Sequence, residues 1–559
     1  MIPPSRSFSP RLGALIGALA LVLLAVAAGL LGSGPLADLA AAGAAPGSPR
    51  ITVMSAAPLA SPVPVATPSP TPLPSPTPAP SPTPIPPVAV VPVTGFRSTA
   101  TGTDAAEVTA VLAGTSKRYA ALEVVTADLP AIMAALGVVA PVDPARLISA
   151  ADAGALRTDL AAHPDRLGML RASQVDPSVR ALGWEGARLF GVGRLGELAQ
   201  WPLQARIVTG AGGTAEAPAY DPASAWTLFA GGDVFLDRGV YLTLSVNKKG
   251  ADFAYDGGSV VITGHTCCSQ FGWTLPVTQR TGDDGALRAL ISGADLAIAN
   301  FENSAPVKFT WHQDGTVFSG DPALISGLKN AGLDWVGLAN NHMGDAGAQG
   351  IRETLAALDA LGIAHGGAGT GYDAAHAPSL LTARGVKVAI LAYDTIAPYY
   401  WAKTATAVGS AQMTAAALTA DVAAARAAGA QVVIVFPHWG TEYTTTRSAD
   451  QVTLGHAAID AGADMVIGNH PHWAGAVELY KGRPIWHALG NFVFDQIWSE
   501  PTLEGITLEL TFNGASLVQA VMRPHLILER TQPNFMDPAG SGKVVMDQVF
   551  KASKGLLPW

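Results

Sequence analysis

Cysteine is almost absent from this chain of 559 residues, which contains only Cys267 and Cys268. The fold must therefore depend on a hydrophobic core, because two adjacent cysteines cannot build the network of cross-links found in small secreted domains. A bond between the two would be strained, since neighbouring Cα atoms lie about 3.8 Å apart and disulfides usually join Cα atoms about 4.4–6.8 Å apart. Two loop thiols are the simpler interpretation, and a vicinal disulfide in an oxidising compartment is the alternative.

Charged residues are also scarce. They make up 14% of the chain, the net charge is −9, and Lys and Arg form no cluster. Binding to a phosphate backbone needs clustered positive charge, so we expect no nucleic-acid partner. Hydrophobic residues account for 49% of the chain. This share excludes a disordered protein, and the length predicts two or three folded units.

One long uncharged hydrophobic run, residues 12–31, lies near the N-terminus and follows Arg6 and Arg11. A helix of about twenty residues spans about 30 Å, which is the thickness of the hydrocarbon core of a bilayer. The positive flank stays in the cytoplasm. We therefore predict a cytoplasmic tail and membrane anchor in residues 1–35, with the head of the protein outside the cell membrane. The alanine-rich residues 37–45 offer the alternative of cleavage as a signal peptide, which would release a secreted protein.

Proline is concentrated in one segment, because fifteen of the 42 prolines lie between Pro58 and Pro92. Proline lacks the backbone donor and fixes φ, so we expect residues 36–93 to be a disordered linker, extended as polyproline II and without helix or sheet. After it, we predict a small accessory α/β domain in residues 94–222, which has short apolar runs but no chemical motif.

From Trp226 onwards, apolar strand-like runs alternate with helix-like segments such as Gly350–Leu361 and Thr414–Ala428. The strand-like runs are Trp226–Ala230, Leu296–Ala299, Trp335–Leu338, Val386–Ala392, Val432–Phe436, Met465–Ile467 and Ile485–His487. This alternation predicts α/β layers with a largely buried sheet. We assign this domain to residues 223–530 and a C-terminal tail to residues 531–559.

Polar side chains follow five of these strand-like runs, where open α/β sheets place their sites. They are Asp233, Glu302, Asn341, His342, Asp345, His438, Glu442, His470 and His472. A single histidine after a strand is usually structural, whereas five such clusters in one domain indicate a shared site. Imidazole, carboxylate and carboxamide ligands suit Mn, Fe or Zn, so we predict one or two divalent transition-metal ions.

These motifs and their order resemble those of the CapA family, also called poly-γ-glutamate capsule biosynthesis proteins, which has a calcineurin-like metallophosphoesterase fold. The stretches that carry the resemblance are Gly231–Val234, Ala294–Glu302, Leu338–Gly347, His438–Tyr443, Gly462–His472 and Leu489–Asp495. The resemblance extends from Trp226 to Ile506. It implies a layered metallophosphoesterase-like sandwich of sheets and helices in the C-terminal half.

The resemblance also implies roles for individual residues. The implied metal ligands are Glu302, bridging two ions, then Asn341, His438 and His470 in one site, and Asp233 and His472 in the other. His342 would protonate the leaving group or stabilise the charge of the transition state, and Asp345 would orient His342. The broader fold usually has Asp-X-His at the first motif, but here Phe235 replaces the histidine. One metal site is therefore short of a protein ligand.

Two functions follow as expectations. The first is a metal-dependent hydrolase or transferase of the cell envelope, acting on a phosphoester or on an anionic polymer such as poly-γ-glutamate. The second is a non-catalytic factor that uses its metal to hold or export an anionic polymer, which the missing histidine favours. The chain contains no P-loop, so an ATP-dependent step would come from other capsule-assembly membrane proteins.

Overall fold

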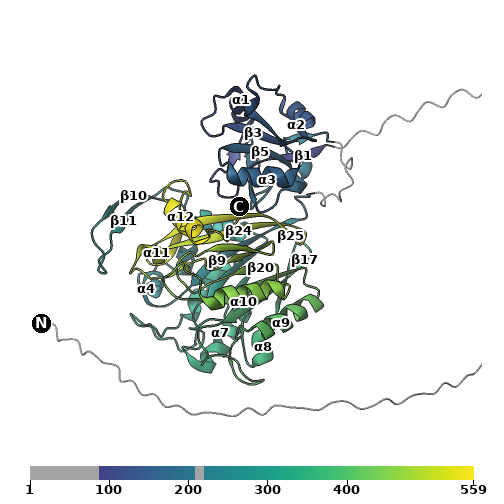
Figure 1. Cartoon of the computed structure of the whole chain (residues 1–559). Helices are drawn as coiled ribbons and strands as arrows, with labels where there is room; N and C mark the ends of the chain where they lie inside the picture. The colour runs from purple at the N-terminus through teal and green to yellow at the C-terminus, as the bar shows by residue number, and fades with distance from the viewer. Residues whose placement is uncertain (1–86, 208–219) are drawn as a thin grey trace, which may run out of the picture. The chain divides into compact units, whose positions relative to one another are not determined.

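Two α/β bodies make up the part of the chain that the computed structural model describes, residues 87–207 and 220–559 (Figure 1). The predicted membrane anchor and all but the end of the predicted linker lie outside these residues. Within the two described ranges, no helix is both long and apolar enough to cross a membrane. All of the described residues belong to one compact unit.

The N-terminal body, which we call the accessory body, is a mixed six-stranded sheet with three helices. Its strands occur in the order β4-β3-β5-β1-β6, and β8 pairs with the start of β1. The strands are β1 (Val88–Gly95), β3 (Ala121–Val125), β4 (Leu147–Ala150), β5 (Arg166–Arg171), β6 (Val179–Ala181) and β8 (Gln204–Ala205), and the helices are α1 (Ala105–Ala113), α2 (Leu129–Leu136) and α3 (Ala153–Ala162). Apolar side chains from β1, β3 and β5 form its core.

Strand β1 differs from the predicted linker, which extended to residue 93. It runs through Pro92 and pairs with β5 on one side and β6 on the other. Proline is tolerated here because its fixed φ is compatible with an extended strand. Its carbonyl accepts a hydrogen bond from Leu182 N at 2.8 Å. The flanking Val91 and Val93 are fully buried. The free energy gained by burying them outweighs the loss of one backbone hydrogen-bond donor.

The C-terminal body is a sandwich of two sheets whose central strands are the strand-like runs of the sequence. The first sheet has the order β14-β13-β12-β9-β24-β25-β26, with β23 paired to the end of β9. Its strands are β9 (Ala225–Val234), β12 (Leu296–Phe301), β13 (Trp335–Gly337), β14 (Ala364–Gly366), β23 (Asn491–Val493), β24 (Glu504–Asn513), β25 (Ser516–Leu528) and β26 (Gln532–Phe535).

The second sheet has the order β16-β17-β19-β20-β22-β21. Its strands are β16 (Ser379–Ala383), β17 (Val386–Asp394), β19 (Val432–His438), β20 (Met465–Ile467), β21 (Val477–Tyr480) and β22 (Arg483–Trp486). The four central strands β17, β19, β20 and β22 are parallel, as are β9, β12, β13 and β14 of the first sheet. Both sheets therefore present carboxyl ends of neighbouring strands along an edge.

Helices cover the outer face of each sheet, so this body has four layers (Figure 1). The helices are α5 (Ala286–Gly293), α6 (Ile325–Ala331) and α7 (Gly347–Leu361) on the first sheet, and α9 (Ala415–Ala427) and α10 (Ala449–Asp460) on the second. Side chains alternate along the strands, so Leu228 of β9 faces the other sheet and Phe229 faces the helices. The layered α/β fold predicted from the sequence is confirmed.

The sandwich continues past the end predicted at residue 530. Strand β26 pairs with β25, and α12 (Lys543–Ala552) follows it. Val545, Met546 and Val549 of α12 are buried in the same core as the residues between the two sheets. Residues 532–552 are thus part of the folded body, because their apolar side chains cover its core.

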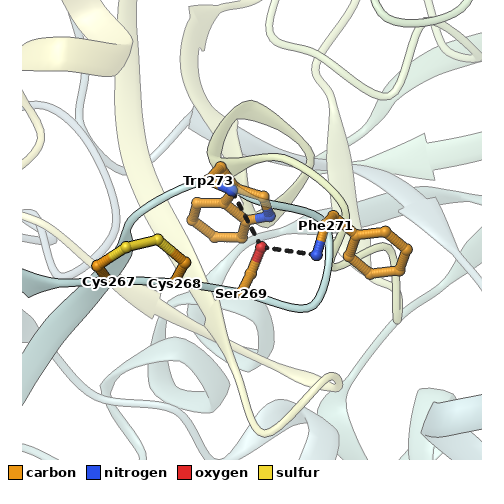
Figure 2. Close-up of a disulfide and its surroundings, with 5 residues drawn as sticks. All are labelled: Cys267, Cys268, Ser269, Phe271 and Trp273. Carbon is orange, nitrogen blue, oxygen red and sulfur yellow. Dashed lines mark hydrogen bonds between the residues drawn. A yellow bond between two sulfur atoms is a disulfide. The ribbon is translucent and has the colours of Figure 1, made fainter.

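A two-stranded hairpin, β10 (Val260–Thr266) and β11 (Leu275–Arg280), carries the two cysteines at its tip, where they form a vicinal disulfide (Figure 2). The interpretation of Cys267 and Cys268 as free loop thiols is therefore wrong. In the turn that follows, Ser269 Oγ accepts hydrogen bonds from the N–H groups of Phe271 at 3.1 Å and Trp273 at 3.3 Å. This turn brings both cysteine side chains to one side, whereas neighbours within a strand point to opposite faces.

Candidate metal centre

Polar side chains from both sheets converge at the carboxyl ends of their parallel strands. Asp233 lies at the end of β9, Glu302 follows β12, and His438 ends β19. All six predicted ligands contribute to one buried cluster: Asp233, Glu302, Asn341, His438, His470 and His472. The sheet topology therefore gathers residues that lie up to 239 positions apart in the sequence.

Three atoms lie around Nε2 of His438 in the first part of the cluster. Asn341 Oδ1 is 2.7 Å away, His470 Nδ1 is 3.0 Å away, and Glu302 Oε1 is 3.6 Å away. These four residues are the set that the resemblance implies for the first metal site.

The second part of the cluster contains Asp233, Glu302 and His472. His472 Nδ1 lies 3.5 Å from Asp233 Oδ2, and His472 Nε2 lies 3.9 Å from Glu302 Oε1. Glu302 is common to both parts, which is the position that a bridging carboxylate needs.

The backbone turns sharply at both histidines of the His-X-His motif. His470 has a φ of 97° and His472 a φ of 59°. Left-handed backbone costs a residue with a side chain roughly 1–2 kcal/mol. This strain accompanies the turn that lets two imidazoles so close in sequence reach the two parts of one cluster.

Asn491 fixes the orientation of His472. Its Nδ2 donates to Gln496 Oε1 at 3.0 Å and to the Thr502 carbonyl at 2.8 Å, so its Oδ1 is left to accept. His472 Nδ1 lies 2.9 Å from that oxygen. The proton therefore belongs on Nδ1, and the lone pair of His472 belongs on Nε2, which faces Glu302.

Glu302 is fully buried, and neither of its carboxylate oxygens has a hydrogen-bond partner among the described residues. Burial first, and then the charges of Asp233 and Glu442, raise the pKa of Glu302 well above its ordinary value. An isolated buried carboxylate is expensive, and buried charges are normally paired or bound to metal. The surroundings of Glu302 therefore fit a cation.

The imidazoles of the cluster fit a cation as well. Burial, followed by the charges of neighbouring histidines, lowers the pKa of both His438 and His470 well below the ordinary value. Metal ions bind the neutral imidazole, and these rings are held neutral. The carboxylate, carboxamide and imidazole donors together suit a divalent transition metal.

His342 and Asp345 form a separate pair beside the cluster. His342 Nδ1 lies 2.9 Å from Asp345 Oδ2, and the His342 ring stacks on Phe318 with 3.8 Å between ring centres. Asp345 Oδ2 also accepts from Phe318 N at 3.0 Å, and its Oδ1 accepts from the Tyr400 hydroxyl at 3.2 Å. Asp345 at Nδ1 and the stacked Phe318 thus fix the orientation of the His342 ring, and Nε2 is the nitrogen left for a reacting group.

Phe235 occupies the position where the broader fold has a histidine. It is fully buried and packs against Phe318 and Phe494, each with 4.6 Å between ring centres. Glu442 supplies an additional carboxylate, because one of its oxygens lies within 4.8 Å of a nitrogen of His470 and 3.9 Å from His472 Nε2. Sequence analysis placed Glu442 after a strand but did not select it as a ligand. Its position four residues after His438 was the available signal.

Arg238 was missed by sequence analysis. It begins α4 (Arg238–Tyr241), is mostly buried, and donates from Nη2 to Asp495 Oδ1 at 2.6 Å. Its guanidinium lies 5.1 Å from the centre of the Phe318 ring, and its charge partly offsets the raised pKa of Glu302. Guanidinium groups in this position bind carboxylate and phosphate oxygens well. The sequence offers no motif that would distinguish this arginine from others.

The two-sheet sandwich and its shared cluster of imidazoles and carboxylates define a metallophosphoesterase-like protein. Residues 227–496 match the family model described as "Bacterial capsule synthesis protein PGA_cap". This region makes up just under half of the chain and is similar to that capsule-synthesis family, and the resemblance to CapA proteins is confirmed.

Known relatives agree with this assignment. The capsule biosynthesis protein CapA of Bacillus anthracis is 28% identical over 50% of this chain and 71% of that protein. The PGA biosynthesis protein CapA of Bacillus subtilis is 30% identical over 40% of this chain and 60% of that protein. The chain thus matches only part of each relative. Among solved structures, the calcineurin-like phosphoesterase YfkN of Bacillus subtilis is 12% identical with a TM-score of 0.29, covering 60% of this chain and 98% of that one.

Proposed function

We propose that this chain is a metal-dependent hydrolase or transferase that acts on an anionic polymer of the cell envelope during capsule or poly-γ-glutamate synthesis. The match of residues 227–496 to the capsule-synthesis family model supports the process, and the names of the two CapA relatives agree with it. The metal in this proposal is one or two ions of Mn, Fe or Zn, which mixed imidazole and carboxylate ligands favour.

The unpartnered carboxylate of Glu302 carries the proposal. A buried carboxylate that serves only stability is normally paired with donors. Glu302 instead lies within reach of His438 and His472 with neither oxygen hydrogen-bonded to a described residue. This arrangement costs free energy in the absence of a cation and is explained by binding one.

Each residue of the cluster has a defined task in this proposal. The metal ligands would be Glu302 for both ions, Asn341, His438 and His470 for one, and Asp233 and His472 for the other. When bound, the metal supplies Lewis-acid polarisation of a phosphoryl or acyl oxygen and a nucleophile at neutral pH. Asn491 keeps the lone pair of His472 directed at the cluster.

The residues beside the cluster would handle the substrate. His342 would hold or transfer a proton at Nε2 while Asp345 accepts from Nδ1 and fixes the ring. The side chain of His342 is 13% exposed, whereas that of His438 is 1% exposed, so only His342 keeps solvent access. Arg238 would pair with a carboxylate or phosphate oxygen of the substrate.

Metal content and hydrolysis together test this proposal. We expect the purified chain to bind a transition metal, and we expect His438→Ala and His470→Ala each to weaken binding at least about 10-fold. His163→Ala, which removes an exposed histidine of the accessory body, should bind as the unaltered chain does. Turnover of a chromogenic phosphodiester should require Mn²⁺ and cease with a chelator. Unchanged metal content in both cluster variants would reject the ligand assignment.

A second candidate function is the holding or export of an anionic polymer without cleavage. Phe235 favours it, because an aromatic ring stands where the broader fold has a ligand. Under this proposal the chain would bind metal and poly-γ-glutamate, and no phosphoester or polymer would be hydrolysed with any metal. The positioned His342–Asp345 pair supports the enzyme, since holding a polymer needs no oriented acid.

The proposed site of action is the outer side of the cell membrane. Support comes from the uncharged residues 12–31 after Arg6 and Arg11, which lie outside the described residues. We expect the protein to fractionate with membranes and its head to be cut by protease added to spheroplasts. Recovery of the uncut chain in the cytosol would contradict this location.

A further inference from the structure

A cavity of about 120 Å³ lies between the accessory body and the first sheet of the sandwich. This volume is several times the roughly 10–15 Å³ that one water molecule needs, so the cavity has room for a small ligand. Three arginines line it: Arg180 of β6, Arg188, and Arg523 of β25. None of them belongs to the metal centre.

One acidic residue, Glu509 of β24, lines this cavity, and both of its oxygens already accept hydrogen bonds. Its Oε1 accepts from Val192 N at 2.7 Å, and its Oε2 accepts from Arg523 Nε at 2.9 Å. The neighbouring Gly191 makes this close approach possible, because a Cβ there would lie 2.5 Å from Glu509 Oε1. Glu509 therefore pairs with Arg523 and acts on Arg180 only at longer range, so one negative charge is set against three arginines.

Arg180 forms no ion pair in the described part of the chain, although the charge of Glu509 acts on it at longer range. Its Nε is buried without a hydrogen-bond partner, and its guanidinium forms no ion pair with any described carboxylate. Burial first, and then the charge of Arg523, lowers the pKa of Arg180 to about 10. The group is still protonated at neutral pH. A buried donor left unsatisfied on a half-buried cation is costly, and a bound anion would satisfy both the charge and the donor.

Most of the remaining residues that line the cavity are apolar, among them Leu182, Phe190 and Met522, although Thr101 and Gln519 also contribute. A hydrated inorganic anion would have to contact this wall, whereas an aliphatic group would be stabilised by it. A second hollow of about 480 Å³ shares Arg188, Glu509 and Arg523 with the cavity. Because Arg188 is exposed, this side offers a route of entry for an anionic ligand.

We infer that this cavity binds a carboxylate carried on a short aliphatic stem, with the carboxylate at Arg180 and the stem against Phe190 and Met522. Guanidinium groups bind carboxylates through two parallel hydrogen bonds, which gives both affinity and orientation. Free glutamate and the glutamyl units of a γ-linked polymer both carry this group. The assignment to the polymer rests on the proposed function, whereas the carboxylate site itself does not.

Calorimetric titration of the full chain, with metal removed by a chelator, tests this inference. The probes are L-glutamate, a γ-linked glutamate oligomer and inorganic phosphate. We expect both carboxylate probes to bind, and we expect Arg180→Met to weaken their binding about 10-fold or more. Arg352→Met, an identical change at an exposed arginine of α7, is the matched control and should bind as the unaltered chain does.

The outcomes separate the possible sources of the carboxylate. Tighter binding of the oligomer assigns the cavity to the polymer, and equal binding assigns it to a single glutamyl unit; both support the site. Phosphate binding as tight as glutamate binding would overturn the assignment of an aliphatic stem. Equal affinity of Arg180→Met and the unaltered chain, or no binding of either carboxylate, would overturn the site.

A second variant and a measurement of metal content keep the inference falsifiable if Arg180→Met does not fold. If Arg180→Met does not fold, Arg188→Met at the exposed side should still weaken binding, and full affinity in that variant would contradict the inference. Metal content of Arg180→Met should equal that of the unaltered chain, because the cavity shares no residue with the metal centre. Failure of the cavity site and failure of the metal proposal therefore give different results.

Discussion

Buried carboxylates occur in both bodies of the chain, and their surroundings differ. In the accessory body, Asp128 is 1% exposed and is held by Arg171 through two hydrogen bonds of 2.7 and 3.0 Å. In the sandwich, Glu302 is equally buried and meets neither an arginine nor a hydrogen-bond donor among the described residues. The first carboxylate stabilises its own fold, whereas the second is stable only when something else supplies positive charge.

The presence or absence of hydrogen-bond partners therefore identifies a candidate functional carboxylate better than its burial does. Asp394, at the end of β17, is also fully buried, but it accepts from Ile396 N at 2.7 Å and from Trp401 Nε1 at 3.0 Å. It braces the loop that carries Tyr400. Asp394 is thus satisfied by its own loop, whereas Glu302, with neither oxygen hydrogen-bonded to a described residue, is a candidate ligand.

The comparison is tested most strongly at His342, which has no ligand role in our proposal. His342→Ala should lower turnover roughly 10²–10⁴-fold, because general acid catalysis contributes a factor of this size. Metal content and melting temperature should stay unchanged. If the residue only braces the loop after β13, the substitution would instead lower the melting temperature and leave the rate of the enzyme intact.

Removing a paired carboxylate from the accessory body should destabilise it. We expect Asp128→Asn to cost about 3–5 kcal/mol, because it leaves the buried Arg171 without its full partner. Hydrogen exchange of the β3 and β5 amides measures this loss within the accessory body. Asp143→Asn, at a surface pair with Arg146, is the control and should cost less than about 1 kcal/mol. Equal effects of the two substitutions would contradict the contrast.

A pH dependence is expected at Glu504, which is buried with Oε1 unpartnered among the described residues. Burial, and then the charge of Glu500, raises its pKa from 4.5 to about 8. The folded state therefore holds a proton that the unfolded state has lost, so stability is full below pH 4.5 and falls as pH rises to about 8. Glu504→Gln should remove this loss, roughly 5 kcal/mol at pH 9 and little at pH 4. The free energy of unfolding measured against pH tests this prediction, and parallel curves for the variant and the unaltered chain would contradict it. Glu197→Gln, at a surface position, is the control.

At the metal centre, a change of acid to amide should have the sign opposite to that of Asp128→Asn. In the metal-free protein, Glu302→Gln should raise the free energy of unfolding by about 1–3 kcal/mol, because it removes a buried carboxyl group whose ionised form is unfavourable there. It should also abolish metal-induced stabilisation. Chemical unfolding with and without added Mn²⁺ measures both effects. A loss of stability like that of Asp128→Asn would show that Glu302 is a structural residue.

The smallest effect is expected at Asp345, which acts through His342. Asp345→Asn should lower turnover by less than the His342 substitution, with metal content unchanged, since the amide still offers one oxygen to Nδ1. A shift of the pH–rate profile together with the lower rate would identify a positioning role. A drop in metal content would instead place Asp345 among the ligands.

Much of the fold could be predicted because its signals are local. The runs Val386–Ala392 and Val432–Phe436 are apolar enough to be buried on both faces, and the structure contains them as β17 and β19. Pro92 shows the limit of such signals. Its lack of a donor favoured a linker, but the burial of Val91 and Val93 decided that β1 forms.

The sequence by itself determined which residues stand at the ends of strands, because strand periodicity and the punctuation by polar residues are properties of neighbouring positions. It therefore indicated Asp233, Glu302 and His438 together. Only the tertiary structure decided which buried charges have partners. The pairing of Asp128 with Arg171, the approach of Arg238 to the centre, and the isolation of Arg180 each depend on segments that are distant in sequence. Electrostatic free energy depends on distance and burial in space, and neither can be calculated from the order of residues along the chain.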